Sequence, residues 1–403
     1  MSSNLLPKEE TNYRALYGKL FSGLLNQFGA NYISEIEDAI QNSFLKSLKI
    51  WKQKDVPNNK ENWLFIVALN DLLNQIKRQK ENNNFSVEQI EDTSSISNET
   101  DLRLQTIIFI STLQSVSNHA KIHFALKNIF GLHTVEISDS TLINQEAIYK
   151  SINRTKKNIQ LEFKGNEIDL NSITANQQAI SIIEEIFYAV FNIGFDSFSE
   201  NTESIVNEDL CLEAFALTKL LFNQYHSDST SNLMAVFCFH ISRISAKVDN
   251  GKLISFFNQD RKKWNKELLN LGFHYLKRPK TLSKFYLEAV IISKYMSVKF
   301  TQNDWNDIVK LYEMMQKVSQ SPIVKMNYCF CLSKIGKTEK ALEILSQIEK
   351  ELPNEHMYLS LVKARILKEI NPKESDDLFI LVMNKMKQKI RKKYLIENEL
   401  IRL

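Results

Sequence analysis

Apolar residues recur along most of this chain at the spacing of an α-helix. Within the stretch ALYGKLFSGLLNQF, such residues follow one another at intervals of four, at Leu16, Leu20, Leu24 and Phe28. This interval brings side chains onto one face of a helix. A second series consists of Ile36, Ile40, Phe44, Leu45, Leu48 and Trp51. The pattern predicts helices over most of residues 13–80, interrupted by the loop KDVPNNKEN around Pro57.

Two polar stretches divide the chain into three helical segments. Residues 84–100 have little apolar periodicity and are predicted to form a flexible linker. The polar sequence KGNEIDLNSITANQQ predicts a second linker over residues 164–180. We therefore expect helical domains at residues 13–83, 101–163 and 181–403.

The last segment contains one clear repeat. PIVKMNYCFCLSKIGKTEKALEILSQIEKELPNE spans about 34 residues, the length of a tetratricopeptide unit. Ala341, Leu345, Ile348 and Pro353 fall where that repeat places small, large and helix-ending residues. The sequence that follows could form a degenerate second helix pair. We expect a helical extension similar to tetratricopeptide repeats, although other helical hairpins share this pattern.

Composition favours an all-α protein. Only 9 Gly and 6 Pro occur in 403 residues, which favours long helices joined by short connections. The first residues, MSSNLLPKEE, do not resemble a signal peptide, and no run of about 18 apolar residues occurs. We therefore expect a cytoplasmic protein that does not bind a membrane. The net charge of +4 is too small to indicate a nucleic-acid partner by itself.

Residue types that often carry chemistry show no catalytic or metal-binding spacing. Four cysteines, Cys211, Cys238, Cys329 and Cys331, are expected to be small core residues in a reducing cytosol. Three isolated histidines are expected to be structural or exposed: His226, His240 and His274. We expect no enzyme activity, no cofactor and no metal.

The run Gln259-Asp260-Arg261, followed by Trp264, is the one combination that invites a catalytic interpretation. Within a single helix, Asp260 and Trp264 would share a face as an i, i+4 pair. This spacing favours a buried structural anchor over a catalytic site.

Residues 101–163 contain the pattern of a helix-turn-helix unit. KIHFALKNIFGLHTVEISDSTLINQEAIYKSINRTKKNIQ predicts a helix, a turn, a short helix, a second turn and a last helix that begins near Asn144. Ile148 and Ile152 give the last helix an apolar side for packing, and Lys150, Arg154 and Lys157 share another side. In a DNA-binding unit such a helix reads base edges, and neighbouring cations hold phosphates. A basic face of this kind can also be merely solvated.

This segment resembles region four of bacterial sigma factors of the extracytoplasmic-function class. The family has an acidic Asp-x-Arg-Leu entry, a Gly-Leu-x-x-x-Glu-Ile turn and a basic recognition helix. The matching residues are Asp101, Arg103, Leu104, Gly131, Leu132, Glu136, Ile137, Lys150, Arg154, Lys156 and Lys157. The resemblance implies recognition of the −35 promoter element by the last helix, through Gln145, Tyr149, Lys150, Ser151, Arg154, Lys156 and Lys157.

The preceding segment resembles sigma region two. EIEDAIQNSFLKSLKIW is similar to the stretch that docks on the polymerase clamp helices, and the matches are Glu37, Asp38, Ala39, Ile40, Gln41, Phe44 and Leu45. WLFIVALNDLLNQIKR is similar to the helix that follows, with Trp63, Leu64, Ala68, Asn70, Lys77 and Arg78 in common. Leu69 and Asn74 depart from the pattern, because the family usually has Arg and Asp there. The helix therefore lacks the guanidinium with which the family's Arg could contact phosphate or the polymerase.

Later motifs are similar to the extension of one sigma subgroup. They read FYAVFNIGF, EDLCLEA, NQDRKKWN and SPIVKMN, and they extend the resemblance over nearly the whole chain. The residues in common include Phe191, Gly194, Cys211, Arg261 and Asn327. Members with such extensions do not depend on a separate anti-sigma protein, so the extension is expected to regulate the sigma part. A stacked helical surface could also accept a peptide or partner protein.

The resemblance implies a sigma factor with core RNA polymerase and promoter DNA as partners. Polymerase binding would fall to Asp38, Gln41, Phe44 and Leu45. Contacts to the −10 element, as duplex and as melted single strand, would fall to Asn58, Asn59, Lys60, Trp63, Asn70, Lys77 and Arg78. Two alternatives remain: a helical interaction scaffold or regulator whose sigma part no longer supports initiation, and an enzyme within the extension, for which no motif is present.

Overall fold

The computed structural model describes residues 6–51, 56–82, 101–141, 143–163, 169–196, 204–352, 356–386 and 388–400. Within these ranges the protein is all-α, as predicted; the strand structure there is one short antiparallel hairpin of β1 (Val248–Asp249) and β2 (Lys252–Leu253). The chain forms two compact units, Met1–Val190 and Phe191–Leu403, called unit 1 and unit 2. The predicted linker at 84–100, part of the linker at 164–180 and Pro353 lie outside the described residues.

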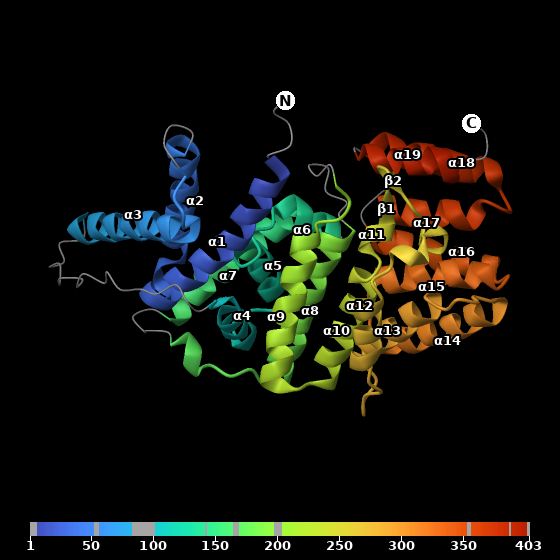
Figure 1. The fold of residues 1–403 in the computed structure, drawn as a ribbon, viewed down its shortest axis with the longest axis horizontal. Helices are drawn as coiled ribbons and strands as arrows, with labels where there is room; N and C mark the ends of the chain where they lie inside the picture. The colour runs from blue at the N-terminus through green and yellow to red at the C-terminus, as the bar shows by residue number, and fades with distance from the viewer. Residues whose placement is uncertain are drawn as a thin grey trace. The chain divides into compact units, whose positions relative to one another are not determined.

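Unit 1 begins with three helices. They are α1 (Leu6–Phe28), α2 (Ile33–Ile50) and α3 (Lys60–Asn82), with the 3-10 turn η1 (Ala30–Tyr32) between the first two (Figure 1). The stripe predicted from the sequence is buried, since Leu20 and Leu24 are at most 1% exposed. Gly29 follows α1 with a positive φ of 78°, a conformation that glycine adopts without steric cost and that turns the chain into α2.

The second half of unit 1 contains the segment that the sequence predicts to be a helix-turn-helix unit. Its helices are α4 (Arg103–Thr112), α5 (Asn118–Asn128), α6 (Thr134–Thr141) and α7 (Gln145–Glu162), followed by η2 (Leu170–Ser172) and α8 (Gln177–Phe195). Gly131 lies in the turn after α5 with a φ of 60°, and the next residue, Leu132, is fully buried. The Glu136 carboxylate then accepts a hydrogen bond of 2.8 Å from the His133 N–H and caps the start of α6.

Unit 2 consists of successive packed helices. They are α9 (Glu208–Tyr225), α10 (Asp228–Ile241), α11 (Ile244–Lys247), α12 (Lys266–Tyr275), α13 (Lys284–Tyr295), α14 (Gln302–Val318), α15 (Pro322–Lys334), α16 (Thr338–Glu351), α17 (Met357–Leu367), α18 (Pro372–Lys385) and α19 (Lys389–Asn398), with 3-10 turns η3 (Phe256–Asn258) and η4 (Arg261–Lys263). Figure 1 shows α14 to α18 stacked on one another, in orange to red. The predicted repeat forms the hairpin of α15 and α16, in which Ala341, Leu345 and Ile348 are buried. The next pair, α17 and α18, packs in the same manner.

The Gln259–Trp264 segment corrects one prediction. Asp260 and Trp264 do not share a helix: the Asp260 carboxylate accepts a hydrogen bond from the Lys262 N–H and caps the short turn η4. Asp260 and Trp264 flank this three-residue turn with extended backbone angles, so they do not share a helical face. Trp264 is nevertheless a buried anchor, as expected, at 7% exposure. Arg261 donates to the carbonyls of Met296 and Ser297, at 2.8 and 2.7 Å, and joins this segment to the end of α13.

Two further sequence expectations concern cysteines and membrane spans. All four cysteines are free and buried, as predicted. Among the described residues, α8 alone is long and apolar enough to cross a membrane by length and composition. Two thirds of its apolar window (67%) is buried in the structure, which is also the behaviour of a core helix in a soluble protein.

Candidate nucleic-acid interface

The last helix of the helix-turn-helix segment, α7, is fixed by its ends and its apolar side. The Asn144 side chain accepts a hydrogen bond of 2.8 Å from the Glu146 N–H and caps the first turn. Ile148, Ile152 and Ile159 are at most 3% exposed and hold one side of α7 against the protein. The opposite side is therefore free to face a ligand.

Five of the seven residues predicted on α7 for DNA contact are exposed. They are Gln145, Tyr149, Lys150, Arg154 and Lys157. Lys150 also forms an ion pair of 2.7 Å with Glu146, one turn earlier, in which both side chains are about three-quarters exposed. An exposed pair of this kind contributes little to stability, so Lys150 can exchange its partner for a phosphate.

The other two predicted residues of α7 face the protein. Ser151 lies 3.3 Å from the Nδ1 atom of His123, and Lys156 forms an ion pair with Glu37 of α2. The exposed side-chain fractions in that pair are 18% for Lys156 and 11% for Glu37. The structure thus brings together five of the seven candidates and places two elsewhere.

Electrostatic contacts surround the Glu37–Lys156 pair. Burial raises the pKa of Glu37, and the ammonium groups of Lys156 and Lys127 counteract part of that rise. Burial also lowers the pKa of Lys127. Close by, Arg14 of α1 donates to Glu136 of α6 at 3.0 Å. These charges belong to the packing inside unit 1 and are unlike the solvated cations on the outer face of α7.

Residues predicted for the −10 element gather at the start of α3. Asn58 and Asn59 are exposed, and the Asn59 side chain also accepts a hydrogen bond from the Asn62 N–H. The Lys60 ammonium lies 5.7 Å from the centre of the Trp51 ring, and the Trp51 and Trp63 rings are 5.4 Å apart. The amide groups and the aromatic pair offer hydrogen bonds and stacking surfaces that unpaired bases can use.

The remaining −10 candidates lie farther along α3. Asn70, Lys77 and Arg78 are exposed. The two residues that depart from the family pattern differ in exposure, since Leu69 is half-buried and Asn74 is exposed. α3 therefore presents amide and cationic groups to solvent despite those departures.

The predicted polymerase-binding residues occupy the outer side of α2. Asp38, Gln41 and Leu45 are exposed and follow one another at helical spacing. Phe44 turns inward and packs edge-on against Tyr13, with ring centres 5.0 Å apart. Leu48 extends the exposed row and is 46% exposed, compared with 57% for Leu45. Sequence reasoning missed Leu48, although its spacing of three after Leu45 was a sufficient signal.

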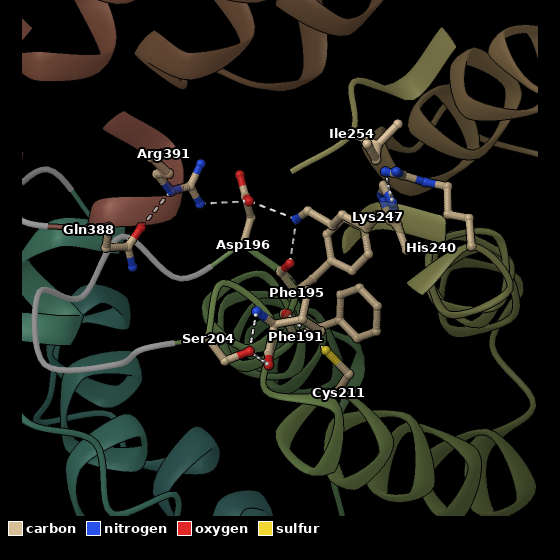
Figure 2. Close-up of polar contacts among 12 residues, drawn as sticks. Phe191, Phe195, Asp196, Ser204, Cys211, His240, Lys247, Ile254, Gln388 and Arg391 are labelled. Atoms are coloured by element: carbon tan, nitrogen blue, oxygen red, sulfur yellow. Dashed lines mark hydrogen bonds and ion pairs between the residues drawn. The ribbon is translucent and has the colours of Figure 1, made fainter. Parts of the chain in front are cut away.

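Unit 2 contains a charge cluster that sequence reasoning missed (Figure 2). Asp196 follows α8, and its Oδ1 atom accepts from Lys247 at 2.7 Å and from Arg391 at 2.8 Å. The Lys247 ammonium also donates to the Phe195 carbonyl at 2.6 Å. Arg391 is held in turn by Gln388, at 2.6 Å. The cluster joins the end of α8 to α11 and to the last helix, α19.

The environment of this cluster shifts several pKa values. Burial lowers the pKa of Lys247 to about 8, although Asp196 opposes the shift. Burial lowers the pKa of Arg243 to about 10, and the Arg243 guanidinium stacks on the rings of Phe195 and Phe256 at 4.8 and 4.6 Å. Lys247 and Arg391 outweigh the effect of burial on Asp196 and hold its pKa well below the ordinary value. The charged groups of this cluster pair with one another and link three helices of the chain, so the cluster has a structural role in unit 2.

The motif residues of the extension form the joint between α8 and α9. A side chain at Gly194 would place its Cβ 3.0 Å from the Asn207 carbonyl and 3.0 Å from the Cys211 sulfur, so the helices approach closely only because this residue is glycine. The Asn207 N–H donates to the Gly194 carbonyl at 2.7 Å, and the Asn207 side chain caps α9. Among the described residues, no three His, Cys, Asp or Glu side chains gather as metal ligands would.

Comparison with known proteins adds two findings. Residues 179–280 match a family of unknown function, DUF6596. The chain is also similar to an uncharacterized protein of Rhizobium meliloti (strain 1021), with 23% identity over 350 residues, which cover 83% of this chain and 82% of that protein. Because neither unit is as long as the aligned stretch, the similarity extends over residues of both units. No solved structure matches the chain.

The matched segment contains the glycine at the close approach of α8 and α9 and most of the charge cluster around Asp196. Gly194, Asp196, Arg243 and Lys247 fall inside residues 179–280, whereas Arg391 lies outside. The charge cluster around Asp196 thus combines residues of the matched segment with Arg391 of the last helix.

Proposed function

We propose that this chain is an RNA polymerase sigma factor that binds core polymerase and directs promoter recognition and transcription initiation. The observation that carries the proposal is the exposed face of α7, where Gln145, Tyr149, Lys150, Arg154 and Lys157 stand opposite a buried isoleucine side. A helix held in this manner behind a short helix and a turn can lie in a major groove with its polar face toward the bases.

The chemistry of that face suits DNA recognition. Arg and Lys side chains pair with guanine edges or with phosphates, and a Gln side chain pairs with adenine. Gln145 donates to the Thr134 hydroxyl at 3.0 Å, which holds its amide near the start of α7, where the recognition helix meets base edges. No covalent chemistry is needed from this chain, because catalysis belongs to the polymerase.

The start of α3 supports the second half of the proposal. Lys60 and Trp63 lie beside Trp51, and the exposed Asn58 and Asn59 precede them in the chain, so a base extruded from the duplex could stack and hydrogen-bond there. Extrusion costs a few kcal/mol for unstacking and unpairing, which a fitted pocket offsets. The exposed row on α2, which ends in Leu45 and Leu48, supplies an apolar surface for the polymerase.

Unit 2 would regulate the sigma part. Its stacked helical hairpins have the kind of surface that accepts peptides or partner proteins in other helical repeats. A regulatory role for unit 2 is compatible with the family match at residues 179–280, which follows residues 101–163 in the chain.

The test is reconstitution. The full chain would be mixed with bacterial core RNA polymerase, and its retention by the polymerase would be measured. Transcription by the mixture would then be run on genomic DNA fragments, and the start sites would be mapped. We expect retention and a defined set of start sites that depends on Arg154 and Lys157. A chain that neither binds core polymerase nor directs any start site would exclude the proposal. Retention without initiation would instead favour an interaction scaffold.

A further inference from the structure

Residues 276–283, here called the basic loop, join α12 to α13 in unit 2. Three positions of this loop carry cations, at Lys277, Arg278 and Lys280, and all three side chains are exposed. None of the three forms an ion pair with a residue that the structure describes. The basic loop therefore presents three solvated positive charges within four positions of the chain.

The sequence around the basic loop contains no compensating negative charge. No Asp or Glu occurs between Glu267 and Glu288, although that stretch contains four cations, the fourth being Lys284. A surface that only needs solubility intersperses charges of both signs, whereas a local excess of one sign attracts a ligand of the other sign. The charge balance of this stretch thus favours an anionic partner.

Two buried polar side chains of α10 fix the backbone of the basic loop. The Ser231 hydroxyl donates to the carbonyl of Tyr275, directly before the loop, at 2.8 Å. The Lys277 N–H donates to the side-chain oxygen of Asn232 at 3.0 Å. Ser231 and Asn232 are at most 1% exposed, and Pro279 restricts the backbone within the loop. A loop held in this manner loses little conformational entropy when its cations bind a ligand.

Apolar residues near the basic loop help to distinguish two anionic partners, a membrane surface and a nucleic acid. Membrane anchors combine cations with apolar side chains that enter the bilayer. Phe273 is 50% exposed, but its ring packs edge-on against the buried Phe239, with ring centres 5.0 Å apart. Within the loop, Leu282 is the one large apolar side chain in the exposed class, at 39%. The exposed chemistry of the loop is therefore chiefly cationic, which suits the phosphates of a nucleic acid.

We propose that the basic loop binds the phosphate backbone of duplex DNA and gives unit 2 a DNA contact of its own. The inference takes its ligand from the proposed function and adds a contact beyond α7 and α3. Lys and Arg bind phosphates without reading the sequence, so the loop contributes affinity and leaves specificity to unit 1. Each phosphate that the loop neutralises releases counterions from the DNA and makes binding more sensitive to salt.

A salt series measures this contribution. The full chain and its variant Lys277→Ala/Arg278→Ala/Lys280→Ala would be titrated with a labelled, mixed-sequence DNA duplex at several salt concentrations. Each lost phosphate contact reduces the slope of log affinity against log salt by about 0.9, so we expect the triple variant to bind with a slope that is shallower by about 2.7.

The matched control is the variant Lys317→Ala/Lys337→Ala/Lys340→Ala. It removes the same charge from unit 2 at three exposed lysines, none of which forms an ion pair with a described residue. We expect this variant to keep the slope of the wild type. Equal flattening in both triple variants would show that only the total charge matters, and it would overturn the proposal.

Photo-cross-linking tests the contact independently of charge. The four native cysteines are buried, so a cysteine introduced at the exposed Thr281 is the accessible site for a thiol-specific photoreactive label. We expect labelled Thr281→Cys to cross-link to the duplex. Labelled Ser346→Cys, at another exposed hydroxyl of unit 2, should remain at background. Cross-linking at Thr281 that does not exceed the level at Ser346 would contradict a contact through the loop.

The outcomes separate this inference from the proposed function. If DNA binding depends on Arg154 and Lys157 but not on the basic loop, the inference fails and the proposed function stands. If the loop contacts DNA but the chain neither binds core polymerase nor directs a start site, the proposed function fails and the loop remains a DNA contact. Retention by vesicles of phosphatidylcholine and phosphatidylserine that is lost in the triple loop variant, with an unchanged DNA slope, would assign the loop to a membrane surface and overturn the proposal. A full chain that does not bind the duplex at all would overturn it as well.

Discussion

Two lysines of α7 show how a residue's place on its helix decides what it can do. Lys150 is exposed and paired only with a residue of its own helix, whereas Lys156 is half-buried and paired with Glu37. Six positions correspond to about two thirds of a turn beyond one full turn, so the two lysines point to different sides. The sequence contained this signal, since Lys156 lies four residues after Ile152 on the apolar stripe. The identity of its partner could not be predicted, because the contact joins residues more than a hundred positions apart.

Substitution on the outer face of α7 tests the proposed DNA contact at single residues. Arg154→Ala and Lys157→Ala each remove one exposed cation. If each holds a phosphate, the slope of log affinity against log salt should become shallower by about 0.9 per substitution. The measurement is fluorescence anisotropy with duplex DNA over a salt series.

Lys310→Ala is the control for that series. Lys310 is a 73% exposed lysine of unit 2 that takes no part in the proposed interface. Its loss should leave the slope unchanged. Slopes that change equally for Lys310 and Arg154 would show that only the total charge matters and would remove α7 from the interface.

Asp196 makes the stability of unit 2 depend on pH. Its pKa is held well below the ordinary 3.8 by Lys247 and Arg391, so its contribution to the free energy of unfolding is complete above pH 3.8 and declines as the pH falls below it. Asp196→Asn leaves two buried cations without this shared anion. We expect a loss of about 1–2 kcal/mol at neutral pH, moderated because 42% of the Asp196 side chain is exposed.

Denaturant unfolding at neutral and acidic pH checks this expectation. The difference between the wild type and Asp196→Asn should shrink as the pH falls below 3.8. Asp249→Asn is the matched control, since its pair with Lys263 is exposed and should contribute less. A difference that stays constant into acid would mean that the Asp196 charge does not stabilise unit 2.

Single helices were predicted correctly where apolar residues recur at regular spacing. The prediction was wrong where a capping hydrogen bond holds the backbone in a turn. The stripe of α1 and the buried isoleucines of α7 follow directly from spacing, as does the pairing of α15 with α16. The segment around Asp260 does not form an α-helix. It forms the short turn η4, in which the Asp260 carboxylate accepts a hydrogen bond from the Lys262 N–H. Spacing alone cannot distinguish an aspartate that faces a helix neighbour from one that caps a turn.

The outer row of α2 gives an element-scale prediction for polymerase binding. Leu48→Ser removes apolar surface from that row while leaving the buried side of α2 intact. We expect capture by core polymerase to weaken on the order of tenfold, since an exposed leucine buried at an interface contributes about 1–2 kcal/mol. The thermal midpoint of the free chain should hardly change. The measurement is co-purification with core polymerase at several concentrations.

Leu220→Ser on α9 is the control for this element. Leu220 is 48% exposed, nearly the same as Leu48, and belongs to unit 2. Equal weakening by both substitutions would indicate a general loss of solubility or folding. Unchanged capture by Leu48→Ser would exclude this row from the polymerase contact.

At the scale of the whole molecule, the hydrophobic pattern does not reveal where one packed unit ends and the next begins. The stretches at 84–100 and 164–180 were predicted from polarity, but a compact unit is defined by contacts. The first part of α8 packs with unit 1, where Phe187 meets Phe130 with ring centres 6.4 Å apart. From Phe191 onward the same helix belongs to unit 2, where that ring stacks on Phe237 at 4.0 Å. Continuous apolar periodicity through α8 carries no mark of this change.

The position of that change decides how the extension can be removed. A chain that ends at Gly165 lacks η2 and α8, and so loses the fully buried Leu170, which packs near α4, and Phe187. Each such side chain contributes about 1.5–3 kcal/mol when buried, so this chain should lose roughly 3 kcal/mol or more. A chain that ends at Val190 keeps both and should unfold near the midpoint of unit 1 in the full protein.

Two measurements separate damage to unit 1 from regulation by unit 2. The first is thermal unfolding of the two truncated chains, and the second compares the promoter output of the more stable one with that of the full chain. Equal stability of the two chains would contradict the assignment of the first part of α8 to unit 1. Equal output of the Val190 chain and the full chain would exclude regulation by the extension.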